Sequence, residues 1–288
     1  MAVVRITEFT DPACPWAYSA EPFRRRLDWL YGTDLVWEVR MVVLSDSPEH
    51  YAAKGFDTKR MAAAYRRIAH DHGMPIDTAE RPRLTASLPA CRAVVAARRE
   101  SPDRMRPLLR RLRVRTFRGE LLDEPATIHG AARDAGIDPD ELERWIADPA
   151  TDEAVREDMA AARAPMPAAL VLDERLANWS GGRRYTCPSY EIERLADGVR
   201  IAVPGFQPFQ VYDVITANLL PGVRRADAPA SAEEVLRWTG TPLASKEVAV
   251  VRDIPLEDAR EELGRVAEEE HVGSDGFWTL PGSHPYGG

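Results

Sequence analysis

Cysteine is scarce in this chain, with three in 288 residues, and the long apolar runs of membrane proteins are missing. Three is a low and odd number, which argues against a secreted scaffold held by disulfides. No stretch of about 18 uncharged apolar residues occurs, so no transmembrane helix is expected. The chain starts in a strand-like run without the basic region and apolar block of a signal peptide, so a cytoplasmic location is expected. Phosphate-loop and G-x-G-x-x-G motifs are missing too, and no spacing of Cys or His predicts a metal site.

The charged residues are unevenly distributed. The formal net charge is −8, and residues 227–288 contain 13 acidic and 5 basic residues, which accounts for all of it. This balance is unfavourable for binding nucleic-acid phosphates, so no nucleic-acid partner is expected. A dense arginine run spans residues 98–118, where Leu108, Leu109 and Leu112 contribute to an apolar stripe at helical spacing. We expect these arginines to form a solvated helix face, with binding of an acidic partner or of nucleic acid as the alternative.

The most informative stretch runs from Thr10 to Tyr18, with the sequence Thr-Asp-Pro-Ala-Cys-Pro-Trp-Ala-Tyr. It follows the alternating run 3–9, which predicts a strand, and it leads into 18–30, whose apolar spacing predicts a helix. Pro15 suits a first helical position, which places Cys14 at a helix N-terminus. Backbone N–H groups and the helix dipole lower the pKa of a thiol there from ~8.5 to roughly 3.5–7.5. Cys14 is therefore the expected nucleophile, and a buried, inert cysteine is the alternative.

The rest of the chain predicts an α/β protein in which strands flank a long helical region. A second strand is expected at 34–44, and a hairpin with strands at 188–194 and 199–203 precedes a final helix at 208–219. Between them, helices are expected at 58–72, 87–100, 102–118, 124–135, 138–147, 151–163 and 168–179. After a Pro/Ala/Gly linker, helices are expected at 231–238, 245–251 and 256–268, followed by a small hairpin that includes 277–280.

A strand, then Asp-x-x-Cys-Pro-Trp, then an amphipathic helix resembles the active-site segment of the DsbA-like branch of the thioredoxin superfamily. FrnE-type and SpxH-type members are the most similar. The resemblance covers about residues 3–220 and implies a thioredoxin fold in two parts, 1–48 and 166–222, with a large helical insertion at 49–165. Residues 227–288 lie outside it; their short helices and hairpin resemble a winged-helix module. We expect this module to contact protein or to dimerise, with DNA binding as the alternative.

The motif departs from the Cys-x-x-Cys of the family because Ala17 stands at the position of the second cysteine. The resemblance places Pro188 at the cis-proline of the family, and it places Cys187, the residue before it, beside the active-site sulfur. Cys187 is then either a small stand-in for the Thr or Val of many relatives or the resolving thiol. In the second case it would form a reversible disulfide with Cys14.

Further candidates for substrate contact are Asp11, Pro15, Trp16, Ala17, Tyr18 and Cys91. Asp11 lies three residues before Cys14 and either adjusts the proton of the thiol or holds a turn. Trp16 and Tyr18 form either an apolar wall for substrate or ordinary packing contacts. Cys91 stands in a Leu-Pro-Ala-Cys segment that resembles the SpxH-type insertion helix over the active site; a helix-buried cysteine is the alternative.

The resemblance implies a thiol–disulfide oxidoreductase of reductase or isomerase type, acting on protein or small-molecule disulfides. Cys14 attacks the disulfide, and Cys187 or an external thiol completes the exchange. No resident cofactor or metal is expected; a low-molecular-weight thiol such as glutathione or mycothiol is the candidate co-substrate. One alternative is a non-catalytic protease adaptor of the SpxH type, with 227–288 binding a protein partner or mediating self-association. Another is a kappa-type glutathione transferase or hydroxychromene-carboxylate isomerase, since one fold supports all three functions.

Overall fold

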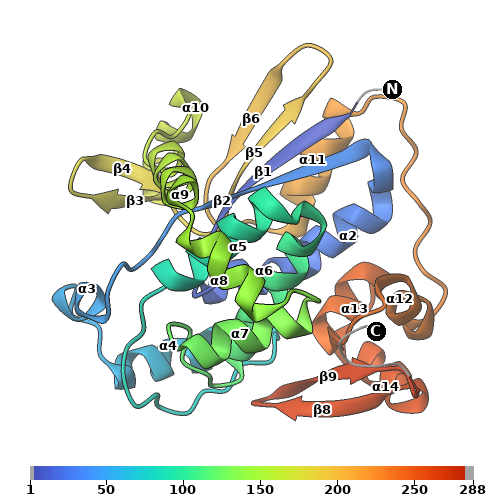
Figure 1. The fold of residues 1–288 in the computed structure, drawn as a ribbon. Coiled ribbons are helices and arrows are strands. Elements are labelled where there is room, and N and C mark those ends of the chain that lie inside the picture. The colour runs from blue at the N-terminus through green and yellow to red at the C-terminus, as the bar shows by residue number, and fades with distance from the viewer. Residues whose placement is uncertain (1–2, 283–288) are drawn as a thin grey trace.

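The central sheet has four strands in the order β2-β1-β5-β6. The structure is a computed structural model that describes residues 3–282 (Figure 1). The strands are β1 (Val4–Thr10), β2 (Leu35–Met41), β5 (Ser189–Arg194) and β6 (Val199–Val203). β1 and β2 are parallel, whereas β5 runs antiparallel to both β1 and β6. This is the sheet of a thioredoxin-like fold, and its strands lie where the alternating apolar runs predict them.

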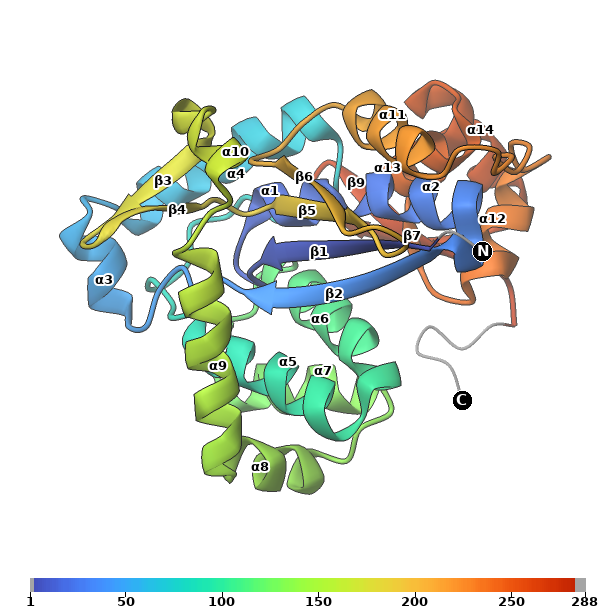
Figure 2. The same cartoon turned by 90° about the horizontal axis from the view of Figure 1, so that it is seen from above.

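Helices cover both faces of the sheet, as Figure 2 shows. On one face lie α2 (Glu21–Tyr31) and α11 (Phe209–Leu219). Their apolar side chains, including Leu27 and Tyr212, pack with Val4 and Ile6 of β1 in one core cluster. The helix predicted after β1 is divided in two, because a short helix α1 (Pro15–Ser19) ends at Ala20 and α2 begins at the next residue.

The helical insertion follows β2. Its helices are α3 (Pro48–Ala53), α4 (Thr58–His72), α5 (Leu88–Glu100), α6 (Pro102–Phe117), α7 (Pro125–Asp134), α8 (Pro139–Ala147) and α9 (Pro149–Ala162). Figure 2 shows α5 to α9 on the other face of the sheet, whereas α4 lies on the side of α2 and contacts α1. Local chemistry sets their ends: α4 stops at Gly73 with φ 73°, and the Asp138 side chain caps α8 by accepting two backbone N–H groups. Val94, Leu108 and Leu142 belong to a core that joins α5, α6 and α8.

The prediction of a helix at 168–179 is wrong. Only α10 (Pro167–Leu170) and a 3-10 turn, η2 (Asp173–Arg175), are helical there. The chain then forms an antiparallel hairpin of β3 (Leu176–Trp179) and β4 (Gly182–Tyr185). Gly182 has a φ of 131°, which L side chains rarely adopt, and it allows the tight reversal. The apolar spacing before it is compatible with a helix, but pairing with β4 determines the strand.

The C-terminal residues form three helices and a small sheet. The elements are α12 (Ala232–Thr239), β7 (Leu243–Ala244), α13 (Ser245–Arg252), α14 (Leu256–Val266), β8 (Glu268–Val272) and β9 (Asp275–Thr279). The strand order is β7-β9-β8, and this sequence of helices and strands is that of a winged helix. The segment packs against α2, where the Trp29 and Trp238 rings meet edge to face at 5.1 Å. No helix among residues 3–282 has the length and apolar character needed to cross a membrane.

The expectation of a solvated arginine face on α6 is wrong for three of its residues. Arg110, Arg111 and Arg113 are only 9%, 7% and 2% exposed. Arg113 donates to Glu21 at 2.8 Å and to Glu8 at 3.2 Å. Arg110 donates to Glu21 and, at 2.6 Å, to Glu247 of α13. These side chains form a buried ion network that connects β1, α2, α6 and α13, because carboxylates from three other elements meet one face of α6.

Candidate active site

Cys14 lies at the junction of β1 and α1, beside the start of β5. Phe9 pairs with Ser189, so the residues that follow β1 lie next to those that precede β5. The Cys14 Sγ is 3.2 Å from the carbonyl oxygen of Cys187, to which the protonated thiol donates. The Cys187–Pro188 peptide bond is cis, as expected. Cys14 and Cys187 are 4% and 8% exposed, so a narrow part of each reaches the surface.

The environment of Cys14 favours its thiolate. Burial alone would raise its pKa, but the Cys187 side chain and the backbone N–H groups of Ala17 and Trp16 hydrogen-bond to the sulfur and lower it below the ordinary value. The opposite holds for Cys187, whose pKa is raised by burial and by its contact with Cys14. The two pKa values are moved in opposite directions, so Cys14 loses its proton before Cys187 does, and the Cys187 S–H then donates to the Cys14 sulfur.

Asp11 is a buried charged neighbour of the Cys14 thiol. Its carboxylate accepts hydrogen bonds from the Ala13 N–H at 2.8 Å, the Leu44 N–H at 2.8 Å and the Ser87 hydroxyl at 2.7 Å. Burial nevertheless raises the pKa of Asp11, and its charge in turn acts to raise that of Cys14. Asp11 therefore holds the turn and acts to raise the pKa of the Cys14 thiol. Its side chain has no surface that substrate can reach.

Cys91 lies on the far side of this carboxylate. It is fully buried in α5, and its Sγ is 3.5 Å from Asp11 Oδ2. Burial and the Asp11 charge raise its pKa far above the ordinary value, so it remains a thiol. This placement corresponds to the helix-buried alternative and not to substrate contact. Among residues 3–282, no group of three or more His, Cys, Asp or Glu side chains is arranged to hold a metal.

The aromatic residues of the motif have different environments. Trp16 is half-buried, and its ring lies 4.9 Å from that of His72 and 5.6 Å from that of Phe206. Tyr18 has no exposed surface; its hydroxyl donates to the Pro75 carbonyl at 3.1 Å, and its ring belongs to the core. The packing alternative therefore holds for Tyr18, which cannot line a substrate site. The half-buried Pro15 and Trp16 remain at the surface beside the thiol.

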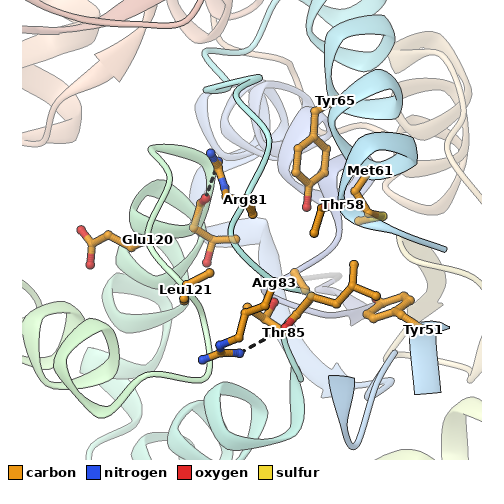
Figure 3. A pocket seen from close by; sticks show the side chains of 12 residues that line it. Tyr51, Thr58, Met61, Tyr65, Arg81, Arg83, Thr85, Glu120 and Leu121 are labelled. Carbon is orange, nitrogen blue, oxygen red and sulfur yellow. Dashed lines mark hydrogen bonds between the residues drawn. The ribbon is translucent and has the colours of Figure 1, made fainter. Parts of the chain in front are cut away.

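A pocket that sequence reasoning missed opens beside Ala13, the residue before Cys14. Figure 3 shows it between α3, α4 and the loops before α5 and after α6. Its lining includes Tyr51, Tyr65, Arg81 and Arg83. No sequence signal distinguishes these residues, because tyrosines on an amphipathic helix and arginines in a loop are ordinary packing and surface residues. Only the folded insertion brings them to the motif.

The fold and this pair of sulfurs define a thioredoxin-fold protein with a cysteine at the N-terminus of the first helix. The family model of the DSBA-like thioredoxin domain matches residues 5–181, more than half of the chain, and the protein therefore belongs to that family. Among curated proteins, it is 26% identical over 279 residues to the ClpXP adapter protein SpxH of Halalkalibacterium halodurans, covering 93% of this chain and 84% of that protein.

Solved structures show the same fold at lower identity. The probable DsbA oxidoreductase of Streptomyces coelicolor is 19% identical with a TM-score of 0.55, covering 78% of this chain and 93% of that chain. The cytosolic disulfide reductase DsbM of Pseudomonas aeruginosa is 18% identical with a TM-score of 0.53, covering 75% of this chain and 99% of that chain. A further DsbM structure contains GSH; it is 18% identical with a TM-score of 0.52, at 75% and 99% coverage. At these identities the likeness concerns the fold alone.

Proposed function

We propose that this protein catalyses thiol–disulfide exchange in the direction of reduction or isomerisation, with Cys14 as the nucleophile. The observation that carries the proposal is the contact between Cys14, whose pKa is lowered, and Cys187, whose pKa is raised. Ala17 replaces the second motif cysteine, so the motif cannot hold the internal disulfide that a two-cysteine oxidase transfers. Reduction and isomerisation need only one attacking thiolate and a second thiol that completes the exchange.

In the first step, the Cys14 thiolate attacks one sulfur of the substrate disulfide. A Cys14–substrate S–S bond forms, the substrate S–S bond breaks, and the other substrate sulfur leaves as a thiolate that takes a proton. In one route, Cys187 gives up its proton and attacks the Cys14 sulfur, which releases the second substrate thiol and forms a Cys14–Cys187 disulfide. Two external thiols then reduce that disulfide.

In the other route, an external thiol attacks the Cys14 sulfur of the mixed disulfide directly, and the second substrate thiol leaves. A second external thiol then attacks that thiol-bound intermediate and restores Cys14. Both routes have the same balance: the substrate disulfide gains two electrons and two protons, and two external thiols become one disulfide. If another thiolate of the same substrate instead attacks the substrate sulfur of the mixed disulfide, a new substrate disulfide forms and Cys14 leaves as the thiolate, which gives isomerisation.

The same proposal assigns protein or small-molecule disulfides as substrates, a low-molecular-weight thiol such as glutathione or mycothiol as reductant, and the cytoplasm as location. The similar fold of DsbM, described as a cytosolic disulfide reductase and solved with GSH, supports these assignments. The exposed edges of Pro15 and Trp16 beside Cys14 would then contact the substrate.

The experiment that tests the proposal is turnover of a disulfide substrate, such as insulin, with a small thiol as reductant. Cys14→Ser is expected to reduce turnover to the uncatalysed rate, because no other described sulfur combines a lowered pKa with access to the surface. Intact mass of an oxidised sample separates the two routes. Loss of two alkylatable thiols together supports the Cys187 route, and an adduct on Cys14 alone supports the external-thiol route. Unchanged turnover in Cys14→Ser would refute the proposal.

A second candidate is a protein adapter, because the SpxH relative named above is a ClpXP adapter and covers nearly the whole chain. Exposed Glu268, Glu269 and Glu270 on β8 are available for a partner. Deleting 227–288 is a poor test, since it would leave Arg25 and Arg110 without Glu247. A better one is capture of a protease partner by Glu268→Lys and Cys14→Ser proteins. Capture lost only in the first favours the adapter, whereas thiol binding without turnover favours the transferase or isomerase class.

A further inference from the structure

A cavity opens beside β2, which is an edge strand of the central sheet. Residues 37–40 of β2 form one side of it, and residues from the end of α5 and the start of α6 form the other. Figure 2 shows α6 next to this strand. The cavity has a volume of about 370 Å³ and is partly open to solvent, which lies within the roughly 300–1,000 Å³ of small-molecule sites. Its lining does not include Cys14, so the exchange chemistry assigns it no role.

The lining of this cavity has a surplus of positive charge. It contains three arginines and one acid. The acid, Glu38, is already paired with Arg5 at 3.1 Å. Two of the arginines, Arg40 and Arg98, share the single carboxylate of Asp158, at 3.0 and 2.7 Å. Two guanidinium groups against one carboxylate leave a net positive charge at this wall, and such a charge attracts an anion.

The third arginine, Arg106, lacks an adequate partner. Its Nη2 is buried without a hydrogen bond among residues 3–282, and its Nη1 lies 3.7 Å from Glu8 Oε2, which is too far for a hydrogen bond. Glu8 instead accepts from Arg113 at 3.2 Å. Burial and, after it, the Arg24 charge lower the pKa of Arg106 to about 10, so its surroundings disfavour the charged form. A buried donor without an acceptor costs free energy, and an anion bound to Arg106 would remove that cost.

Apolar side chains complete the lining. Trp37 donates its indole N–H to Asp28 at 2.6 Å, which fixes the orientation of the ring. The guanidinium carbon of Arg106 lies 5.1 Å from the centre of the Trp37 ring, so the cation and the aromatic surface adjoin. Pro102 and Met105 add further apolar surface from the start of α6. A ligand that suits this lining has an anionic group for the arginines and an apolar group for Trp37.

A phosphate group matches the available donors better than a carboxylate does. Arg40 on β2 uses its Nη1 for Asp158, whereas Arg106 on α6 retains the buried Nη2. A phosphate monoester carries close to two negative charges at neutral pH and three strong acceptor oxygens. Those oxygens are arranged tetrahedrally, so they can accept from guanidinium groups on two different elements at once. A carboxylate has one charge and two oxygens in a single plane.

We propose that this cavity binds the phosphate monoester of a small aromatic compound. The phosphate accepts hydrogen bonds from Arg40 and Arg106, and the ring of the ligand packs against Trp37. The site is separate from Cys14, and its assignment does not depend on the proposed exchange reaction.

The test is calorimetric binding of four probes to the full chain: phenyl phosphate, methyl phosphate, inorganic phosphate and benzoate. We expect phenyl phosphate to bind most tightly, because it alone combines the dianion with a ring. Arg106→Gln should weaken its binding by roughly tenfold or more, as the loss of hydrogen bonds to a charged group does. The matched variant Arg104→Gln removes an exposed arginine of the same helix outside the cavity lining, and it should bind phenyl phosphate like wild type.

Thermal unfolding gives a second readout. Without ligand, Arg106→Gln should have a midpoint equal to or above that of wild type, because the variant loses an unpartnered buried donor. Phenyl phosphate should raise the midpoint of wild type and not that of Arg106→Gln, since only a bound ligand stabilises the folded state.

Several results would overturn the proposal. Phenyl phosphate that binds no more tightly than methyl or inorganic phosphate would remove the role of Trp37, and tighter binding of benzoate would remove that of the phosphate. An equal loss in Arg104→Gln would reduce the effect to general surface charge. A large drop in the midpoint of ligand-free Arg106→Gln would make Arg106 a structural partner of Glu8, and the absence of binding by any probe would leave no site.

Discussion

At the scale of single residues, the thiolate of Cys14 depends on hydrogen-bond donors around it. Two are the backbone N–H groups of Trp16 and Ala17, which do not depend on the side chains of these two residues. The third is the Cys187 side chain, which substitution can change. This separates what the helix N-terminus contributes from what the neighbouring thiol contributes.

We predict that Cys187→Ala raises the pKa of Cys14, because the alanine removes a donor that stabilises only the thiolate. The matched variant Cys187→Ser retains a hydroxyl donor and should keep the pKa closer to that of wild type. The pKa is measured as the midpoint of the alkylation rate against pH, from about pH 4 to 9. For wild type we expect a midpoint below the ~8.5 of a free cysteine, since a lowered pKa keeps the thiolate populated at lower pH.

Two outcomes would contradict this prediction. A wild-type midpoint at the value of a free cysteine would mean that burial dominates over the hydrogen bonds. Equal midpoints in the Ala and Ser variants would mean that the side chain of residue 187 does not donate to Cys14. Because Cys91 and Cys187 both have raised pKa values, fast alkylation at low pH reports on Cys14 alone.

The position of Cys14 at a helix N-terminus could be predicted from the sequence, whereas the surroundings of its neighbours could not. Strand, Cys-Pro and amphipathic helix are local signals, and they place Cys14 at a helix N-terminus. Whether Tyr18 faces the surface depends on Pro75 and Phe117, which belong to distant parts of the chain. The same applies to Arg110 and Arg113, since periodicity cannot show that carboxylates from other elements will cover them.

At the scale of elements, α13 is held to the rest of the molecule by a buried carboxylate. Glu247 is 0% exposed and accepts from Arg25 Nε of α2 at 2.6 Å, as well as from Arg110 of α6. It also accepts the Ala244 N–H at 2.8 Å, which caps α13. One side chain therefore connects the C-terminal segment, the thioredoxin-fold helix and the insertion.

We predict that Glu247→Ala lowers the free energy of unfolding by about 3–5 kcal/mol, because it leaves the buried Arg25 guanidinium without its acid and takes from Arg110 one of its two carboxylate partners. The control is Glu261→Ala, whose partner Arg265 lies at the surface with a 64% exposed side chain. That exposed pair should contribute under about 1 kcal/mol. Chemical denaturation followed by tryptophan fluorescence measures both, and similar small losses in the two variants would contradict the role given to Glu247.

Local sequence signals predict most of the helices and strands, and the hairpin of β3 and β4 is the exception. The helix predicted at 58–72 has the bounds of α4, since Asp57 caps its start and Gly73 ends it. The hairpin of β3 and β4 was not predictable, because a two-stranded sheet is defined by pairing between segments and not by the spacing within one. The spacing of apolar residues within a segment predicts whether it is a helix or a strand only where that segment's own sequence decides what it packs against.

At the scale of the whole molecule, the buried ion network makes stability depend on acid pH. The Arg110 and Arg113 guanidinium groups overcome the burial that would raise the pKa of Glu21, and they lower it to about 2. An unfolded glutamate has a pKa of ~4.3. A depressed pKa stabilises the folded state fully above the unfolded value, and this stabilisation is lost as pH falls through the folded value.

We therefore predict that the free energy of unfolding falls between about pH 4.3 and 2, with Glu21 accounting for a loss on the order of 3 kcal/mol. Glu8, whose pKa Arg113 and Arg106 lower against the effect of its burial, adds to the same trend. Denaturant unfolding at a series of pH values, followed by circular dichroism and by fluorescence, measures the slope and shows whether the two probes report one transition. Glu21→Gln should be less stable at neutral pH and should show a flatter acid slope, because no carboxyl group remains at residue 21 to be protonated.

The network joins α2, α6 and α13, so the sheet, the insertion and the C-terminal segment should lose structure together. An early separate transition with an unchanged slope in Glu21→Gln would show that these parts unfold independently and that other carboxylates determine the acid response.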